Sequence, residues 1–344
     1  MSLKIYGKLP SGERNKRIKL SPQYRQGSFQ NLSVTNAMAE DASFFKTLKE
    51  FIHKPKEARP SSILPSVKTQ LSTLSGNNGP EVVWFGHSSY FLAVDGLNLL
   101  VDPVFSGNAA PVKFMVKAFE GADVYGVKDM PEIDILLLTH DHYDHLDYKT
   151  VQALRTKVKM VVCSLGVGSH LEHWGFSAKR IHELDWHESY SLQHITLTAA
   201  PARHFSGRGI KRGQTLWSSF VLQTKQHQLY LGGDSGYDSH FKELGKKYGS
   251  FDLAILESGQ YNAFWPHIHM MPEQTVQACV DLNAQRLLPV HWGKFSLAMH
   301  PWTEPIERVL LKATELKVQV LTPKIGEVLS IQQPSQHSHW WKNL

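Results

Sequence analysis

The stretch ILLLTHDHYDHLD, residues 135–147, places three histidines and three aspartates directly after a run of aliphatic residues. Such an aliphatic run is typical of a buried strand, and a buried strand carries the loop that follows it on a rigid base. A solvated loop that happened to be rich in histidine would have no reason to follow a core strand so closely. The stretch therefore predicts a metal centre at the end of a strand.

Four residues of this loop, His140, His142, Asp144 and His145, have side chains that bind transition metals. His140 and His142 are two residues apart, so in an extended turn they can point the same way and share one metal ion. Asp144 and His145 can then bind a second ion beside the first. Imidazole nitrogen and carboxylate oxygen suit Zn²⁺, and also Mn²⁺ or Fe²⁺.

Three further candidate ligands stand at the ends of apolar strands later in the chain. His204 ends ITLTAAPARH, Asp234 ends LYLGGD and His291 ends RLLPVH. Each of them alone would be interpreted as an ordinary hydrogen-bonded loop or core residue. Together with the four residues of the first loop they make seven ligands, which is enough for two metal ions.

The composition is that of a globular protein. Of the 344 residues 42% are hydrophobic, and no window approaches the ~18 consecutive apolar residues of a membrane span. The net charge of +6 is concentrated in part in the first 25 residues, which have no apolar segment typical of a secretory signal. Cys163 and Cys279 are too few for a disulfide framework, so we expect reduced thiols and a cytoplasmic protein.

Three regions are expected from the change in composition along the chain. Residues 1–80 form an N-terminal extension rich in Pro, Ser, Lys and Asn, with one amphipathic helix predicted over 41–54. That helix either packs on the body of the protein or lies on a membrane surface. Residues 81–332 are expected to form the main domain. Residues 333–344 form a tail that either packs through its two tryptophans or frays.

The main domain has the pattern of an α/β fold. Its first strands form hairpins, with a turn at Asp95-Gly96, and later strands alternate with helices. This order predicts mixed sheets covered by helices. The predicted helices cover residues 147–157, 239–248, 272–283 and 305–316.

The ligand pattern resembles the metallo-β-lactamase superfamily, whose hallmark is T-H-x-H-x-D-H followed by a distant His, Asp and His. The resemblance implies an αββα sandwich, two mixed β-sheets flanked by helices, with two metal ions at one edge of the sheets. It implies one ion held by His140, His142 and His204, the other held by Asp144, His145 and His291, and Asp234 bridging the two.

Segments around the ligands, including HDHYDHLDY, GGDSGY, FDLAILESGQY, IHMMPEQTV and VHWGKFSLA, allow a finer comparison. They resemble the branch that contains N-acylphosphatidylethanolamine-hydrolysing phospholipase D and its bacterial relatives. In that branch a histidine before a P-E-x-x-V helix start lines the substrate site, and His269 matches it. The sequence departs from that branch over 107–126, where an arginine-rich stretch is absent.

The charges of such a centre predict its chemistry. Two divalent ions bring four positive charges and Asp144 and Asp234 return two, so a water that bridges the ions has its pKa lowered towards ~7. The resulting metal-bridging hydroxide is expected to attack the phosphorus of a phosphodiester. Asp144 and His269 are the catalytic candidates, and we expect His269 to bind a phosphate oxygen or to protonate the leaving group.

Three polar residues near the ligand motifs are candidates for supporting roles: His87 in GHSS, Asp102 in VDP and Asp147 in HLDY. A metal-bound imidazole usually donates its second N–H to a carboxylate or a carbonyl. We therefore expect these residues to contact the ligands, with capping of a loop as the alternative for each.

The expected reaction is phospholipase D-like hydrolysis of N-acylphosphatidylethanolamine or a related phospholipid, with two Zn²⁺ ions as cofactor. The alternative is a lactonase of the ascorbate-6-phosphate lactonase type, acting on a small phosphorylated lactone. A metal-stabilised binding module without activity is a third hypothesis. Nucleic acid is not an expected partner, because no basic patch with interleaved aromatic residues is evident. Peripheral contact with a membrane stays open.

Overall fold

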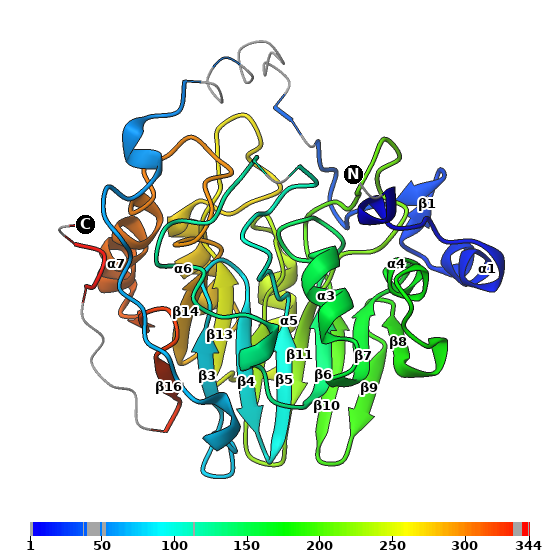
Figure 1. The fold of residues 1–344 in the computed structure, drawn as a ribbon. Helices are drawn as coiled ribbons and strands as arrows, with labels where there is room; N and C mark the ends of the chain where they lie inside the picture. Colours follow the sequence, from blue (N-terminus) through cyan, green and yellow to red (C-terminus); the bar gives the residue numbers. More distant parts are fainter. Residues whose placement is uncertain are drawn as a thin grey trace.

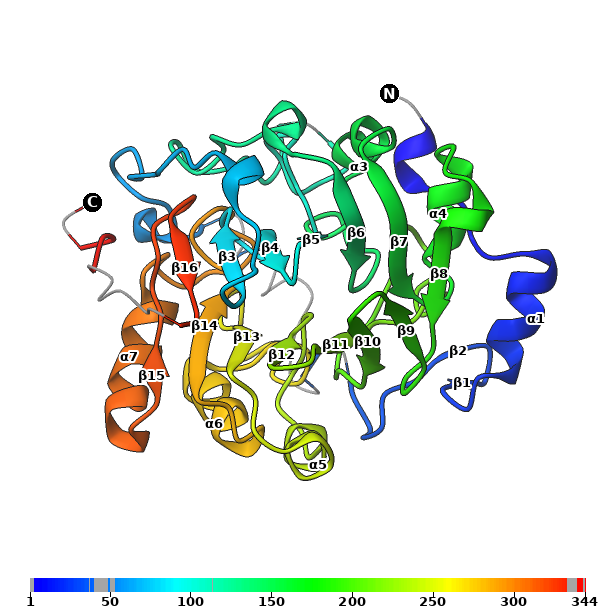
Figure 2. The same cartoon turned by 90° about the horizontal axis from the view of Figure 1, so that it is seen from below.

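Two seven-stranded β-sheets lie face to face, and Figure 2 shows both of them in cross-section. In each sheet, four strands at one end run parallel and the others pair antiparallel. The first sheet contains, in spatial order, β16 (Val328–Ser330), β3 (Glu81–Trp84), β4 (Tyr90–Val94), β5 (Leu97–Val101), β6 (Ile133–Leu138), β7 (Val158–Ser164) and β8 (Ile181–Leu184). The second contains β15 (Gln319–Val320), β14 (Arg286–Val290), β13 (Leu253–Glu257), β12 (Gln228–Leu231), β11 (Ser219–Gln223), β10 (Ile195–Ala200) and β9 (Ser189–Leu192).

Apolar side chains cover both faces of each sheet. In β4, Leu92 and Val94 point into the core between the sheets, whereas Phe91 and Ala93 point to the outer face. Both sets are buried because helices cover the outer faces. Over the first sheet lie α3 (Tyr148–Leu154) and α4 (Gly168–His173), and over the second lie α5 (His240–Tyr248), α6 (Pro272–Asp281) and α7 (Glu304–Leu316). The predicted αββα sandwich is therefore confirmed.

The structure is a computed structural model. It describes residues 3–36, 38–39, 49, 53–112, 114–332, 339–342 and 344. The apolar stripe of the helix predicted over 41–54 lies outside these residues. The hairpin predicted at Asp95-Gly96 is confirmed, since Val94 pairs with Leu97 and both turn residues have positive φ. Helices α3, α5, α6 and α7 match the four predicted ranges to within a few residues at their ends.

The N-terminal segment contains a helix that the sequence did not reveal, α1 (Gly12–Leu20), followed by the small hairpin of β1 (Tyr24–Arg25) and β2 (Ser28–Phe29). Only Ile18 of α1 is buried, so no apolar stripe marks the helix. Ion pairs hold it instead, because Arg14 lies 2.6 Å from Glu183 and 3.0 Å from Glu172. These partners are more than 150 residues away in the sequence, which explains why local pattern could not predict the helix.

The strand directions bring several loops to one edge of the sandwich. In the first sheet β3, β5 and β6 run in the same direction, and in the second β10, β12, β13 and β14 do. The loops that follow these strands lie together on the upper side in Figure 1. No helix in the described part of the chain is long and apolar enough to cross a membrane.

The end of the chain packs on this edge through tryptophans. The ring of Trp340 stacks on Trp292 at 5.4 Å, and Trp341 meets Trp292 edge-on at 5.6 Å. Trp302 completes the cluster by stacking on the same indole. Since Trp292 directly follows His291, the tail supports a loop that carries a predicted ligand.

Replacing Trp341 by alanine should lower the free energy of unfolding by about 3–5 kcal/mol, because a large ring that is only 2% exposed leaves a cavity. Urea denaturation followed by far-ultraviolet circular dichroism measures this change. Leu311→Ala is the control, since Leu311 is 76% exposed and its loss should change stability by less than about 0.5 kcal/mol. Equal effects of the two variants would contradict the packing role of the tail.

Candidate metal centre

The loops at this edge bring all seven predicted ligands together. Four of them follow β6, and one each follows β10, β12 and β14. All are buried except His142 and Asp144, which are partly exposed. Segments up to about 150 residues apart in the sequence therefore contribute to one site. The seven candidate ligands are His140, His142, Asp144, His145, His204, Asp234 and His291.

Three imidazoles converge on one point. His142 Nδ1 lies 3.0 Å from His140 Nε2 and 3.2 Å from His204 Nε2. Ligand atoms about 2.1 Å from a tetrahedral metal ion lie about 3.4 Å from one another, so these separations are within about 0.4 Å of those in such a site. Asp234 Oδ2 lies 3.9 Å from His140 Nε2 and 3.7 Å from His204 Nε2. The carboxylate is thus placed beside the three imidazoles.

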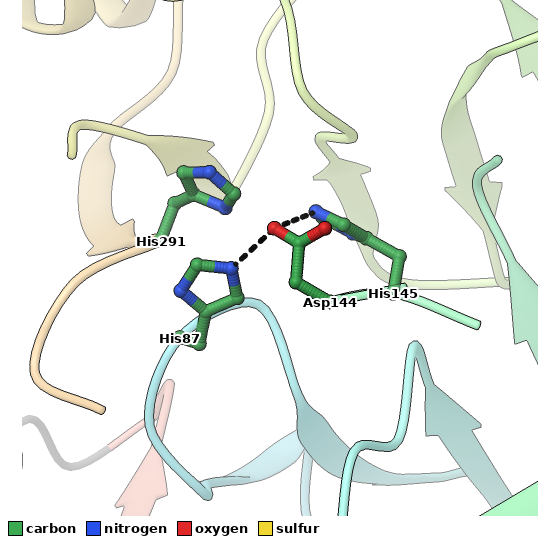
Figure 3. A group of neighbouring side chains, drawn as sticks. All are labelled: His87, Asp144, His145 and His291. Atoms are coloured by element: carbon green, nitrogen blue, oxygen red, sulfur yellow. Dashed lines mark hydrogen bonds and ion pairs between the residues drawn. The ribbon is translucent and has the colours of Figure 1, made fainter. Parts of the chain in front are cut away.

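A second group of donors adjoins the first and is drawn in Figure 3. It contains Asp144, His145 and His291, together with His87. His145 Nε2 lies 3.6 Å from Asp144 Oδ2 and 3.1 Å from Asp234 Oδ2. The other oxygen of Asp234, Oδ1, lies 3.1 Å from His291 Nδ1. Asp234 therefore stands between the two groups of donors.

Two buried atoms at the centre, His145 Nε2 and Asp234 Oδ1, have no hydrogen-bond partner among the residues that the structure describes. A buried polar atom without a partner costs about 1–3 kcal/mol, so such atoms need an explanation. A metal ion between them would satisfy both. The donor types, their spacing and these unsatisfied atoms fit a pair of transition-metal ions.

Asp102 holds part of the centre in place. Its carboxylate accepts hydrogen bonds from the Thr139 backbone N–H at 2.9 Å, from the Thr139 hydroxyl at 2.6 Å and from His145 Nδ1 at 2.8 Å. The bond to His145 fixes the tautomer that leaves Nε2 free for a metal. His204 is oriented in the same way, since its Nδ1 donates to the Ile268 carbonyl at 2.8 Å.

His87 contacts a ligand as well. Its Nε2 donates to Asp144 Oδ2 at 2.9 Å, and its backbone carbonyl accepts from the His291 N–H at 3.0 Å. The residue has a φ of +53°, an uncommon conformation for a residue with a side chain. The turn between β3 and β4 thus contacts both the loop of Asp144 and the loop of His291. The positive φ of His87 is a backbone strain that accompanies these contacts.

Asp147 has a different place. Its carboxylate caps α3 by accepting from the Lys149 N–H at 3.2 Å and from the Thr150 hydroxyl, and it also accepts from the Ser106 N–H at 3.1 Å. Among the described residues it makes no hydrogen bond to an imidazole. The capping alternative therefore describes the contacts of Asp147 best.

Burial sets the charge of the imidazoles. It lowers the pKa of His140, His204 and His291 well below the usual value for histidine, so these rings are neutral with lone pairs available to a metal. Burial alone would raise the pKa of Asp234, but the positive charge of His145, which is protonated when no metal ion takes the place of the proton on its Nε2, outweighs this and lowers it to about 2. Asp234 is therefore an anion at neutral pH.

His269 lies at the rim of the centre, and ligand-type atoms of His204, Asp234 and His269 fall within 4.8 Å of one another. Sequence reasoning missed a neighbouring residue, Glu257, which ends β13 and has an oxygen 3.6 Å from His269 Nδ1. Its signal was available, because a carboxylate ending an apolar strand between the strands of Asp234 and His291 follows the same rule that identified those ligands.

The roles of Asp102 and Asp147 can be separated by amide substitutions. Asp102→Asn should weaken binding of metal about 10–100-fold, because the amide NH₂ would face a donor at Thr139 or His145. Asp147→Asn should leave metal affinity unchanged, since Asn caps a helix as well as Asp does. Titration of the metal-free proteins with Zn²⁺ against a chromophoric chelator measures both affinities. Equal losses in the two variants would contradict these assignments.

Comparisons with known proteins agree with this geometry. A family model described as a beta-lactamase superfamily domain matches residues 97–292. An uncharacterized protein of Mycobacterium tuberculosis is 38% identical over 327 residues, which cover 94% of this chain and 88% of that protein. The N-acyl-phosphatidylethanolamine-hydrolyzing phospholipase D 1 of Caenorhabditis elegans is 28% identical over 286 residues, 78% of this chain and 80% of that enzyme.

Among solved structures, a metallo hydrolase from Ignicoccus hospitalis has the same fold, with a TM-score of 0.54 and 19% identity over 73% of this chain and 97% of that one. The family model covers more than half of the chain. The chain belongs to the beta-lactamase superfamily and has its metallo-β-lactamase fold.

Proposed function

We propose that this protein is a hydrolase with two zinc ions that cleaves phosphodiesters, and that it acts on N-acylphosphatidylethanolamine or a related phospholipid in the manner of a phospholipase D. The observation that carries the proposal is the position of Asp234. One of its oxygens faces His140, His145 and His204, and the other faces His291. A carboxylate shared in this way between two groups of donors is the arrangement that a dinuclear centre requires.

Different residues would bind the metal ions, orient the ligands and contact the substrate. His140, His142 and His204 would hold one ion, Asp144, His145 and His291 would hold the other, and Asp234 would contact both. Bound zinc supplies Lewis-acid activation of water and of a phosphoryl group. Asp102 and His87 keep the ligands oriented through their hydrogen bonds to His145 and Asp144. His269, at the rim, is placed to contact a substrate oxygen.

Two cavities, one of them bounded by the candidate ligand His204, support a phospholipid as substrate. A cavity of about 210 Å³ has His204, Phe205 and the exposed Arg212 in its wall, so it offers a cation to a phosphate close to the ligands. A second cavity of about 500 Å³ is lined largely by apolar residues such as Pro111 and Phe114, and Asp147 forms part of its wall. Apolar surface of this kind suits an acyl chain.

The phospholipase D activity of the worm relative supports the same substrate class. Cys163 and Cys279 are both buried and unpaired, which supports a cytoplasmic location for the reaction.

A substrate panel tests the proposal directly. Zinc-loaded protein should cleave N-acylphosphatidylethanolamine and a chromogenic phosphodiester, and chelation should abolish both activities. Asp234→Asn should lower kcat at least about a hundredfold, because the residue contacts both groups of donors. Asp281→Asn, a carboxylate on α6 that contacts Tyr237 and Gln277, is the control and should keep full activity.

The panel also separates the alternatives. Opening of lactones without cleavage of any phosphodiester would replace the phospholipase proposal by the lactonase one. Full retention of the measured activity by Asp234→Asn would contradict a catalytic centre at this site, and would favour a metal-stabilised binding module.

The cavity beside His204 gives a prediction for substrate affinity. Arg212→Ala should raise KM for an anionic phosphodiester about tenfold with little change in kcat, because a charged hydrogen bond contributes about 1.5–3 kcal/mol. Lys211→Ala removes the same charge from the neighbouring position, which does not line that cavity, and should leave KM unchanged. Steady-state kinetics at fixed ionic strength measure both values. Equal shifts in KM would indicate a general charge effect.

A further inference from the structure

The carboxyl group of Glu257 lies at the ligand edge, but the centre described above does not use it. Glu257 ends β13 and is 1% exposed. Its Oε1 accepts from the Met270 N–H at 2.6 Å, and its backbone carbonyl accepts from the Thr275 hydroxyl at 2.9 Å. Its Oε2 is buried without a hydrogen-bond partner in the described part of the chain. An unsatisfied carboxylate at this depth is costly, so a role beyond packing is indicated.

A second buried atom without a hydrogen-bond partner among the described residues belongs to His269, beside this carboxylate. His269 Nδ1 is buried and lies 3.6 Å from Glu257 Oε1. This separation exceeds a usual N–H···O distance by about 0.7 Å, and such bonds at reaction centres commonly shorten when substrate binds. A small rotation of the His269 ring would bring its Nδ1 within hydrogen-bond distance of the Glu257 carboxylate.

The His269 ring is held between two of the proposed ligands. It stacks on His291 with 5.1 Å between centroids and 23° between planes, and it meets His204 at 5.1 Å and 60°. Both neighbours restrict the tilt of the ring, but neither determines which nitrogen carries the proton. Glu257 is placed to do so, because a carboxylate accepts and never donates when ionised.

We propose that Glu257 is the positioning residue of His269: its carboxylate accepts the Nδ1–H of the imidazole and so leaves Nε2 to face the substrate oxygen. This inference rests on the proposed function, since His269 is the residue expected to contact the substrate. Glu257 orients the ring as the third member of a catalytic triad orients its histidine. It touches neither substrate nor metal in this role.

Substitutions at Glu257 test the proposal through kcat. Glu257→Gln keeps the shape and the acceptor for Met270, but its NH₂ group favours the opposite tautomer of His269; kcat should fall about 10–100-fold with KM changed less than about threefold. Zinc content should stay at the wild-type value. Thr275→Val is the matched control. It removes the hydrogen bond from the Thr275 hydroxyl to the Glu257 backbone carbonyl and leaves the Glu257 carboxylate in place.

A double-mutant cycle separates positioning from packing. His269→Ala should lower kcat about a hundredfold. Adding Glu257→Gln to His269→Ala should cause less than about a twofold further loss, because a residue that acts through His269 has no effect once the ring is gone. Multiplicative losses would overturn the proposal, and so would full activity of Glu257→Gln. Loss of zinc in His269→Ala would also overturn it, by making His269 a ligand.

Nuclear magnetic resonance gives a readout that needs no substrate. In zinc-loaded protein labelled with ¹⁵N-histidine, long-range ¹H–¹⁵N spectra should show His269, identified by its absence in His269→Ala, protonated at Nδ1. Glu257→Gln should move that proton to Nε2, and Thr275→Val should not. A Nδ1 without a proton in the wild type would overturn the proposal. If no substrate of the panel is cleaved, the proposed function fails while this measurement still decides the role of Glu257.

Discussion

The structure depends on one buried carboxylate. Asp234 stands at the end of β12, with His145 Nε2 at 3.1 Å and His291 Nδ1 at 3.1 Å on its two oxygens. A carboxylate buried without compensating charge would cost several kcal/mol, so the groups around it must remain in place. They come from both sheets: His145 follows β6 of the first and His291 follows β14 of the second. The edges of the two sheets are therefore held together by polar contacts to Asp234 as well as by the apolar core between them.

Segments outside the two sheets support the same edge. Trp340 and Trp341 pack on Trp292, next to His291. Arg208 connects the N-terminal segment to the ligand loop that follows β6. Its guanidinium group donates to the carbonyl oxygens of Asp141 and Leu146 at 2.7 Å and to that of Ile5 at 2.8 Å. Residues near both ends of the described chain thus contact the loops that carry the candidate ligands. Such support matters because ligands displaced by 1 Å no longer fit a metal ion.

Much of the fold and of the candidate site could be predicted from sequence, and the failures have physical reasons. Apolar strands ending in His or Asp identified seven residues that the structure does bring together. Helix α1 was missed because its stability comes from Arg14 paired with distant glutamates, which leaves no local apolar pattern. Asp147 was interpreted as a possible support for the ligands, yet its hydrogen bonds cap α3. Glu257 was not selected although it ends an apolar strand as the ligand motifs do; its contacts with Met270 and His269 became visible only in the structure.

The sequence by itself determined the donor types, their order and their attachment to strands, because the alternation of apolar residues and the residues at strand ends are local properties. Those properties predicted mixed sheets covered by helices and a metal centre at the end of a strand, and the resemblance to the metallo-β-lactamase superfamily implied the αββα sandwich. Only the tertiary structure decided which donors meet and what orients them. Asp102 reaches His145 because the parallel strands β5 and β6 end side by side. His87 reaches Asp144 from the turn between β3 and β4. Contacts of this kind depend on the register between strands and on the packing of one sheet upon the other, which no local pattern encodes.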